Sequence, residues 1–411
     1  MQVHSGIRRY EAAARGENKK TGGTKMKKRI LALLMAGVLA VGLTACGGTS
    51  GETEETGGEA AETAGIAAAD LKVGLILVGE AADAYNKNHI EGMQAACETL
   101  GLDYDTQVVV KTNIGEDSTC ADAIGELIDA GCQAIFANSF GHEQYMVEAA
   151  PDYPDVQFCH ATGYQSASDD LDNTHNYFAK IFEARYLAGI AAGLKTETNV
   201  LGYVAAKPYA EVISGYTAFY LGAKSVNPDV TMLVNYTNEW SDATKEATNA
   251  QALIDQGCDV ISQHSDTSAP ATTAENNGVF AVGYNDDMIS VAPNAALVSA
   301  RINWGSYYEY ALGCLLSGEA IAQDWCGSYA ENACYLSDLN EAIIAEGTKE
   351  AIEAAAAGIT DGSVQVFAGP LHGVNANGDE LNLAEGEFYT ENESSSAPAF
   401  DYIIDGITVL S

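Results

Sequence analysis

Two stretches decide the fold: Leu127-Ile128-Asp129-Ala130-Gly131-Cys132-Gln133-Ala134-Ile135 and, 126 residues later, Leu253-Ile254-Asp255-Gln256-Gly257-Cys258-Asp259-Val260-Ile261. Each reads as the end of an amphipathic helix, a glycine just beyond it, and a buried strand. Asp117 and Asp242 lie upstream of the two stretches and are predicted to cap the helices. There is no third copy, so we expect two lobes of like topology rather than a solenoid. Chance similarity between two helix–glycine–strand units is the alternative.

Outward from these stretches, short β-branched runs alternate with helical patterns. The run 73–78 is almost continuously apolar, which is typical of parallel strands covered on both faces. The alternation predicts an α/β fold of two doubly wound parallel-sheet lobes, with a ligand cleft between them. The predicted strands are 72–78, 108–111, 134–137, 156–159, 200–204, 231–236, 260–263, 279–283 and 297–302. The predicted helices include 91–100, 120–130, 183–194, 214–225, 245–256 and 306–316.

The N-terminal part has the pattern of an export signal. A basic stretch, 27–29, precedes an apolar run, 30–43, that is shorter than the roughly 20 residues needed to span a bilayer. The run ends in Leu43-Thr44-Ala45-Cys46, which resembles a bacterial lipobox. We therefore expect residues 1–25 to be an upstream extension and 26–45 a lipoprotein signal peptide. Cys46 would then carry the lipid that anchors the exported protein to the outer face of the cell membrane.

Beyond Cys46, composition separates a tether from a folded body. Residues 46–70 contain no aromatic residue and predict a flexible tether. The remaining chain is longer than one hydrophobic core usually supports. We predict a first lobe from 71–165 with about 298–330, and a second from 166–297 with about 331–411.

The charge is strongly acidic. The chain has 20 basic and 57 acidic residues, a net charge of −37. Nine basic and two acidic residues precede Cys46, which leaves the mature chain at −44. Such a body should repel nucleic acid, so no nucleic-acid partner is expected. Most of this charge is expected to lie on a solvated surface that keeps the protein soluble, and it says little about the ligand.

The cysteines and glycines give no sign of a metal or a cofactor. No two cysteines form a Cys-x-x-Cys pair, and the histidines lie at no zinc-ligand spacing from them. The only plausible local disulfide joins Cys326 and Cys334; otherwise the cysteines are predicted to be structural. No Gly-x-Gly-x-x-Gly follows a strand, and there is no Walker-type run.

The residues just after each strand are candidates for ligand binding, because the carboxyl ends of parallel strands line the crevice. These segments are rich in aromatic and acidic residues, and Lys207 is almost their only cation. A phosphate or carboxylate ligand would need Arg, Lys or a glycine-rich nest. The set therefore favours a neutral ligand with ring faces and N–H or O–H donors, such as a nucleobase, nucleoside or sugar. The candidates are Tyr85, Asn86, His89, Ser139, Phe140, Gly141, Glu211, Trp240, His264, Asp266, Asp287 and Trp304.

Within this set, Tyr85 and Trp240 are predicted to sandwich the ligand, since stacking on an aromatic ring contributes about 1–3 kcal/mol per base. Asp287 is the leading acceptor, because it lies at the predicted lobe crossover. Other roles stay open for some candidates. Phe140 and Trp304 could be packing residues, His89 could pack at its helix start, and His264 and Asp266 could cap a helix.

The chain closely resembles the basic-membrane-protein family of ABC-transporter substrate-binding lipoproteins, a group with purine-nucleoside-binding members. The resemblance covers Leu71 to about Gly373. It is carried by Tyr177–Gly189, Asn227–Asp229, Trp240–Asp242 with Lys245-Glu246, Ile254–Gly257, Gln263–Asp266, Gly283–Asp287 and Asn303–Gly305.

The resemblance implies a type I periplasmic-binding-protein fold, an ABC permease as partner, and purine-stacking aromatics at Tyr85 and Trp240. The nucleoside-binding branch has a Ser-Phe-Asn motif where this chain has Ala84-Tyr85-Asn86. That departure shifts the expectation toward a free purine base such as adenine. A sugar or other polar-ligand binder on the same fold is the alternative.

An enzyme is the remaining class, for instance a nucleoside hydrolase acting through Asp287 and His264. No Gly-x-Ser-x-Gly elbow is present. We therefore expect no catalytic residues.

Overall fold

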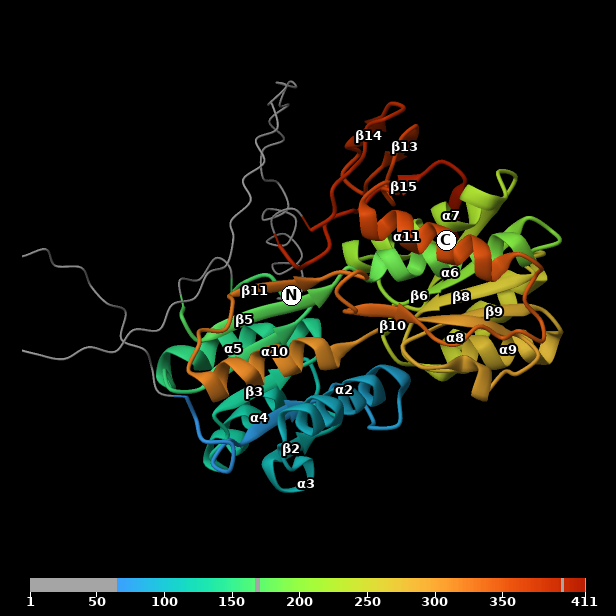
Figure 1. The fold of residues 1–411 in the computed structure, drawn as a ribbon. Helices are drawn as coiled ribbons and strands as arrows, with labels where there is room; N and C mark the ends of the chain where they lie inside the picture. The colour runs from blue at the N-terminus through green and yellow to red at the C-terminus, as the bar shows by residue number, and fades with distance from the viewer. Residues whose placement is uncertain (1–64, 167–170, 393–394, 411) are drawn as a thin grey trace, which may run out of the picture. The chain divides into compact units, whose positions relative to one another are not determined.

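The computed structural model describes residues 65–166, 171–392 and 395–410. The predicted signal peptide, Cys46 and most of the tether lie outside these residues. Two parallel sheets dominate the described chain, each with helices on its faces (Figure 1). Among the described residues, none of the helices has the length and apolar character to cross a bilayer.

The first sheet has six strands in the order β11-β5-β4-β3-β1-β2, and all its pairings are parallel. The strands are β1 (Val73–Ile76), β2 (Val108–Lys111), β3 (Ala134–Ala137), β4 (Gln157–Ala161), β5 (Thr174–Ala179) and β11 (Asp324–Gly327). Its helices are α2 (Ala84–Leu100), α3 (Tyr104–Gln107), α4 (Ser118–Asp129), α5 (Glu143–Ala149) and α10 (Trp304–Ser317), with the short turns η1 (Phe140–His142) and η2 (Ala150–Asp152). Strands β1 and β3 are buried along their whole length, which explains their apolar sequences.

The second sheet has seven strands in the order β12-β10-β9-β8-β6-β7-β16. Its strands are β6 (Val200–Ala205), β7 (Thr231–Tyr236), β8 (Val260–His264), β9 (Phe280–Tyr284), β10 (Ala296–Ile302), β12 (Cys334–Leu336) and β16 (Ile407–Val409). Only β12 runs antiparallel to its neighbour among these described strands. Its helices are α6 (Ile181–Lys195), α7 (Ala210–Val226), α8 (Ala243–Asp255), α9 (Ala269–Asn277) and α11 (Thr348–Asp361), with the turn η3 (Met288–Ser290).

The internal repeat is confirmed in the backbone. Asp117 caps α4 by accepting from the Thr119 amide, and Asp242 caps α8 by accepting from the Thr244 and Lys245 amides. Gly131 and Gly257 then follow their helices with φ of 84° and 95°, a region that glycine enters without strain. The equivalence extends upstream, since Asn113 and Asn238 have φ of 57° and 60°. Each helix leads through its glycine into a buried strand of its own sheet.

The predicted lobe boundaries need correction. Strand β5 was assigned to the second lobe by the boundary at 165 and 166, but it pairs with β4 in the first sheet. The chain therefore crosses between the sheets after Ala179. It crosses back after Ile302 rather than at 297, because β10 belongs to the second sheet throughout, and a third time between β11 and β12.

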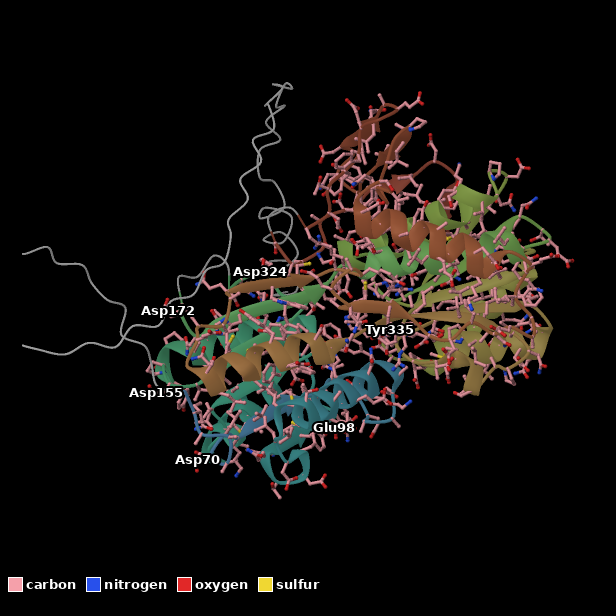
Figure 2. All side chains as sticks on the ribbon, in the orientation of Figure 1. Asp70, Glu98, Asp155, Asp172, Asp324 and Tyr335 are labelled. Carbon is pink, nitrogen blue, oxygen red and sulfur yellow. The ribbon has the colours of Figure 1, made fainter. Side chains whose placement is uncertain are left out.

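The C-terminal part adds a small third sheet, β14-β13-β15, formed by β13 (Leu371–Val374), β14 (Glu380–Leu383) and β15 (Ile403–Ile404). Strand β16 follows and extends the second sheet beside β7. The eight described cysteines are free thiols, so the open possibility of a Cys326–Cys334 disulfide is not realised. Acidic side chains such as Asp70, Glu98 and Asp155 are exposed, in agreement with the expectation that the negative charge lies on a solvated surface (Figure 2).

Candidate ligand-binding site

A small pocket lies between the two sheets, at the carboxyl ends of their strands. The first sheet's side of the pocket is lined by Val78, Tyr85, Asn138, Ser139, Phe140 and Thr162, and the second sheet's side by Glu211, Trp240, His264, Asp266 and Tyr284. These residues end or follow strands β1, β3, β4, β7, β8 and β9, or lie in the first turns of helices α2 and α7. This placement is the one expected for a ligand crevice in open α/β sheets.

The pocket is nearly closed in this structure. Its free volume is about 20 Å³, room for roughly one water molecule. Contacts between the lobes surround it: the Ala84 amide donates to the Asp266 carbonyl at 3.2 Å, and Lys207 Nζ lies 3.6 Å from Glu116 Oε2. A ligand with a ring system can therefore enter only when the lobes move apart, a hinge motion common in two-lobed binding proteins.

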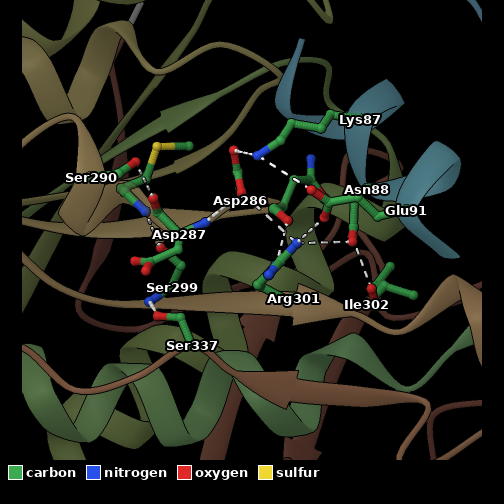
Figure 3. Close-up of polar contacts among 12 residues, drawn as sticks. Lys87, Asn88, Glu91, Asp286, Asp287, Ser290, Ser299, Arg301, Ile302 and Ser337 are labelled. Atoms are coloured by element: carbon green, nitrogen blue, oxygen red, sulfur yellow. Dashed lines mark hydrogen bonds and ion pairs between the residues drawn. The ribbon is translucent and has the colours of Figure 1, made fainter. Parts of the chain in front are cut away.

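A second set of contacts closes the lobes along helix α2 (Figure 3). Lys87 Nζ lies 2.6 Å from Asp286 Oδ2, and Arg301 Nη2 lies 3.0 Å from Glu91 Oε2. The Asn88 side chain donates to the Ile302 carbonyl at 2.8 Å. Lys87, Asn88 and Glu91 come from α2. Their partners belong to the second sheet: Asp286 lies in the turn after β9, and Arg301 and Ile302 lie in β10.

The aromatic residues predicted to stack are both in the pocket lining, one from each lobe. The Tyr85 hydroxyl donates to the Asn138 carbonyl at 2.6 Å, which fixes its ring. The Trp240 ring lies 6.0 Å from the Tyr209 ring, and Lys207 Nζ lies 5.6 Å from it. The Trp240 indole N–H is buried and has no partner among the described residues. It is therefore available to a ligand or to a bound water.

The acidic residues of the pocket have strongly altered ionisation. Burial raises the pKa of Glu211 to about 7, although the Arg185 charge opposes this rise. Burial, with the nearby carboxylates of Glu246, Asp83 and Glu211, raises the pKa of Asp266 well above its usual range. Burial lowers the pKa of His264, which is therefore neutral, and its Nε2 lies 3.4 Å from Glu211 Oε1. The pocket thus offers two carboxyl groups whose protonation a ligand can shift.

Ser139, Phe140 and Gly141 form one loop held by Glu116. The Ser139 hydroxyl and the Gly141 amide both donate to Glu116 Oε1, at 2.8 and 2.9 Å. Ser139 and Phe140 belong to the pocket lining, and Gly141 does not. The Phe140 ring packs 5.5 Å from Tyr209 of the other lobe, so it contributes to lobe contact as well as to the pocket.

Four other candidates lie outside the lining. Asn86 is buried and bonded to the Asn138 side chain and the Glu80 carbonyl. His89 is buried, with its ring stacked 4.1 Å from Trp304, so both belong to the packing between α2 and α10. Asp287 caps η3 by accepting from the Ile289 amide at 3.0 Å.

Sequence reasoning did not select Val78, Asn138, Thr162 and Tyr284, which also line the pocket. Asn138 and Tyr284 lie in the segments where strands end, so position alone could have found them. Thr162 directly follows β4, which ends two residues beyond the predicted strand 156–159. Its φ of 67° is unusual for a β-branched residue, and strained backbone of this kind concentrates at functional sites.

The fold and the position of the site define a class: two-lobed solute-binding proteins that hold a ligand between α/β lobes. A solved solute-binding protein of an ABC transporter system from Aeropyrum pernix K1 shares this fold, with a TM-score of 0.62 and 19% identity over 72% of this chain and 93% of that one.

The chain belongs to the Bmp family, described as ABC transporter substrate-binding protein PnrA-like, which matches residues 71–356. It is 34% identical to a purine-binding protein of Brucella abortus over 73% of this chain and 84% of that protein. It is also 32% identical to TsgA13 of Haloferax volcanii, provisionally named a glucose-binding protein of an ABC transporter, over 87% of this chain and 88% of that protein. The predictions of family, of fold class and of a binding protein rather than an enzyme are thereby confirmed. Substrate-binding proteins of ABC importers act outside the cytoplasm.

Proposed function

We propose that this substrate-binding protein captures a purine base, with adenine favoured, and delivers it to an ABC permease. The observation that carries the proposal is a pocket with Tyr85 and Trp240 on opposite lobes and two carboxyl groups, Glu211 and Asp266, beside them. The rings match the two faces of a flat heterocycle, and the carboxyl groups match its N–H donors. The name of the Brucella relative supports the same ligand class.

The lining also argues against anionic ligands. Its described residues include no Lys or Arg, and phosphate sites normally need such cations or a glycine-rich nest. A nucleotide or an organic acid would face two carboxyl groups with no cation in the lining to contact it. A neutral base or nucleoside meets no such penalty.

The proposal includes export and lipid attachment at Cys46. The basic stretch, the short apolar run and the sequence Leu43-Thr44-Ala45-Cys46 support it. The tether, 46–70, would then hold the binding lobes away from the membrane surface.

One set of measurements on protein extracted from its own membranes tests both parts. An intact-mass spectrum should show a chain that begins at Cys46 and carries lipid, and a native spectrum should show a bound purine. Adenine, guanine, hypoxanthine and their nucleosides are then added to ligand-free protein in a thermal-shift panel. At 100 times its Kd, a ligand stabilises the fold by about 2.7 kcal/mol.

A sugar is the second candidate, because the relative from Haloferax volcanii is named for glucose. Glucose and other hexoses therefore belong in the same panel. Stabilisation by a hexose, with no response to any purine base or nucleoside, would overturn the purine assignment. An unlipidated N-terminus would overturn the anchor alone.

A further inference from the structure

Arg185 lies in α6, outside the pocket lining and buried beneath it, with 1% of its surface exposed. Its Nη1 donates to the Gln263 carbonyl at 2.6 Å. The guanidinium carbon lies 3.7 Å from the centre of the Tyr284 ring and 5.8 Å from that of Tyr203. Its Nε and Nη2 have no hydrogen-bond partner among the described residues. The buried Arg185 guanidinium thus makes one hydrogen bond and lies over the faces of two tyrosine rings.

A buried arginine cannot relieve its environment by losing a proton, because its pKa is too high. Such a charge needs a nearby countercharge to be tolerated. A series of contacts leads from Arg185 to one: the Tyr284 ring against it lies 4.7 Å from the His264 ring, and His264 Nε2 lies 3.4 Å from Glu211 Oε1. Tyr284, His264 and Glu211 all line the pocket. Arg185 is therefore a positive charge packed against the side of Tyr284 and His264 that lies behind the pocket lining.

The ionisable groups around Glu211 come from several elements. Arg185 lowers the pKa of Glu211 against the larger effect of burial, which raises it to about 7. His264 beside it is neutral, because burial and the same arginine lower its pKa. Asp266, in the loop after β8, and Tyr85, in α2, also lie near Glu211, because the Glu211 charge contributes to the raised pKa of each. Glu211 thus titrates near neutral pH, and Arg185 supplies the charge that opposes the effect of burial on its pKa.

We propose that Arg185 is a positioning residue of the binding pocket: from behind Tyr284 and His264, its charge keeps Glu211 a carboxylate that accepts a hydrogen bond from the ligand. The ligand class follows, since a carboxylate acceptor selects a neutral molecule with an N–H or O–H donor on the edge that meets Glu211. This step rests on the proposed function only in using adenine as the probe.

The first test needs no ligand. The Glu side chains are labelled with ¹³C, and the carboxyl signals are followed by NMR from pH 5 to 9 in ligand-free protein, with Glu211→Gln identifying the signal. We expect a midpoint near 7 in the wild type, and a midpoint about one unit or more higher in Arg185→Met, as for loss of a nearby opposite charge. An unchanged midpoint in Arg185→Met would overturn the proposal.

The second test measures adenine affinity by calorimetry over the same pH range. If only the carboxylate form binds, affinity falls about tenfold per pH unit below the Glu211 midpoint. Arg185→Met should begin to lose affinity at higher pH, whereas Arg185→Lys, which keeps the charge, should restore the wild-type profile. Arg301→Met is the matched control, because Arg301 is the other arginine among the described residues and joins the lobes away from Glu211. It should leave the pH midpoint in place.

Glu211→Gln tests the same inference if Arg185→Met fails to fold. In an otherwise wild-type protein it should remove the pH dependence of adenine binding between pH 6 and 8, and Asp266→Asn should not. Persistence of the dependence in Glu211→Gln would contradict the inference. If adenine does not bind at all but the NMR midpoint shifts, the purine assignment fails while the role of Arg185 stands.

Discussion

At the scale of single residues, the pocket joins side chains that lie far apart in the sequence. Tyr85 begins α2 of the first lobe, and Trp240 precedes α8 of the second. Both reach the same small cavity. Because stacking needs only a flat face, these two rings would tolerate related heterocycles, and the carboxyl groups beside them would discriminate among those heterocycles.

Removing either ring should weaken binding. We expect Tyr85→Ala and Trp240→Ala each to lower adenine affinity by about 1–3 kcal/mol, roughly 5- to 150-fold. Tyr85→Phe should keep most of the affinity, since it loses only the hydroxyl bond to the Asn138 carbonyl. Calorimetry measures the effect, with Tyr153→Ala as the control, because Tyr153 is 41% exposed and outside the pocket lining. Affinities equal to that of the control would contradict the stacking geometry.

How far sequence could predict the site depended on the residue. Tyr85, Trp240, Glu211 and Asp266 were identifiable because they follow strands or begin helices at one edge of the sheets. Trp304 was ambiguous for a physical reason: a residue at a helix start can face a pocket or a neighbouring helix. Here Gly92 of α2 leaves room for close approach, since a Cβ at Gly92 would lie 3.0 Å from the Trp304 Cβ. Arg185 lies in Tyr177–Gly189, a stretch that carries the family resemblance, but its largely apolar helix gave no sign that the charge lies near the pocket.

At the scale of elements, helix α2 connects the two lobes through ion pairs. Lys87 and Glu91 lie one turn apart on α2 and meet Asp286 and Arg301 of the second lobe. The sequence analysis predicted Asp287 as a ligand acceptor. In the structure Asp287 caps η3, and the neighbouring Asp286 accepts a hydrogen bond from Lys87 of α2 (Figure 3). Adjacent residues point in different directions after a strand, and only the turn geometry decides between them.

Breaking one of these pairs should favour the open form. We expect Lys87→Met to weaken adenine binding by about 0.2–1 kcal/mol, roughly 1.5- to 5-fold, the range measured for partly exposed ion pairs. The loss should shrink as salt is added, because salt screens the wild-type pair. Lys111→Met is the matched control, since its partner Glu126 lies on the same lobe. An equal loss in both variants, measured by titration at two salt concentrations, would show that the α2 pairs play no part in closure.

The nine strands found from sequence were those with apolar, β-branched runs. Seven strands of the described residues, β5 and β11 to β16, were not predicted, and β5 shows the limit of that signal. β5 begins with Thr174, His175 and Asn176, yet all six of its residues are buried. Its polar groups are satisfied by tertiary partners: His175 bonds the Ala322 carbonyl and Gln157, and Asn176 donates to Glu143. No local pattern reveals a strand whose polar residues depend on distant partners.

At the scale of the whole molecule, the chain beyond residue 356 lies outside the family match but inside the fold. Glu391 is buried and accepts from the amides of Ala399 and Phe400 at 3.2 and 2.9 Å. Asp324 of the first sheet accepts from the Ser396 amide at 2.8 Å. The C-terminal segment is thus fastened to both sheets, because β16 also pairs with β7.

Glu391 should make stability depend on pH. Burial raises its pKa to about 7 in the fold, from about 4.3 in an unfolded chain. A raised pKa means that folding favours the protonated form of Glu391. The contribution of Glu391 to the free energy of unfolding is therefore fully present at low pH and is lost as the pH rises through about 7. Glu391→Gln should therefore gain stability relative to the wild type between pH 5 and pH 8, by up to ~3 kcal/mol.

Thermal melts at several pH values measure this gain. Glu341→Gln, at an exposed position, serves as the control and should follow the wild type. A constant difference between Glu391→Gln and the wild type at every pH would contradict the assignment.

The three passages of the chain between the sheets, after Ala179, after Ile302 and between β11 and β12, have a mechanical consequence. Segments anchored at both ends and crossing together resist sliding and twisting of the lobes, and leave rotation about one axis as the easy movement. Whether a ligand is bound is then reflected in one quantity, the angle between the two lobes. A permease that touches both lobes could measure that angle without ever contacting the captured molecule.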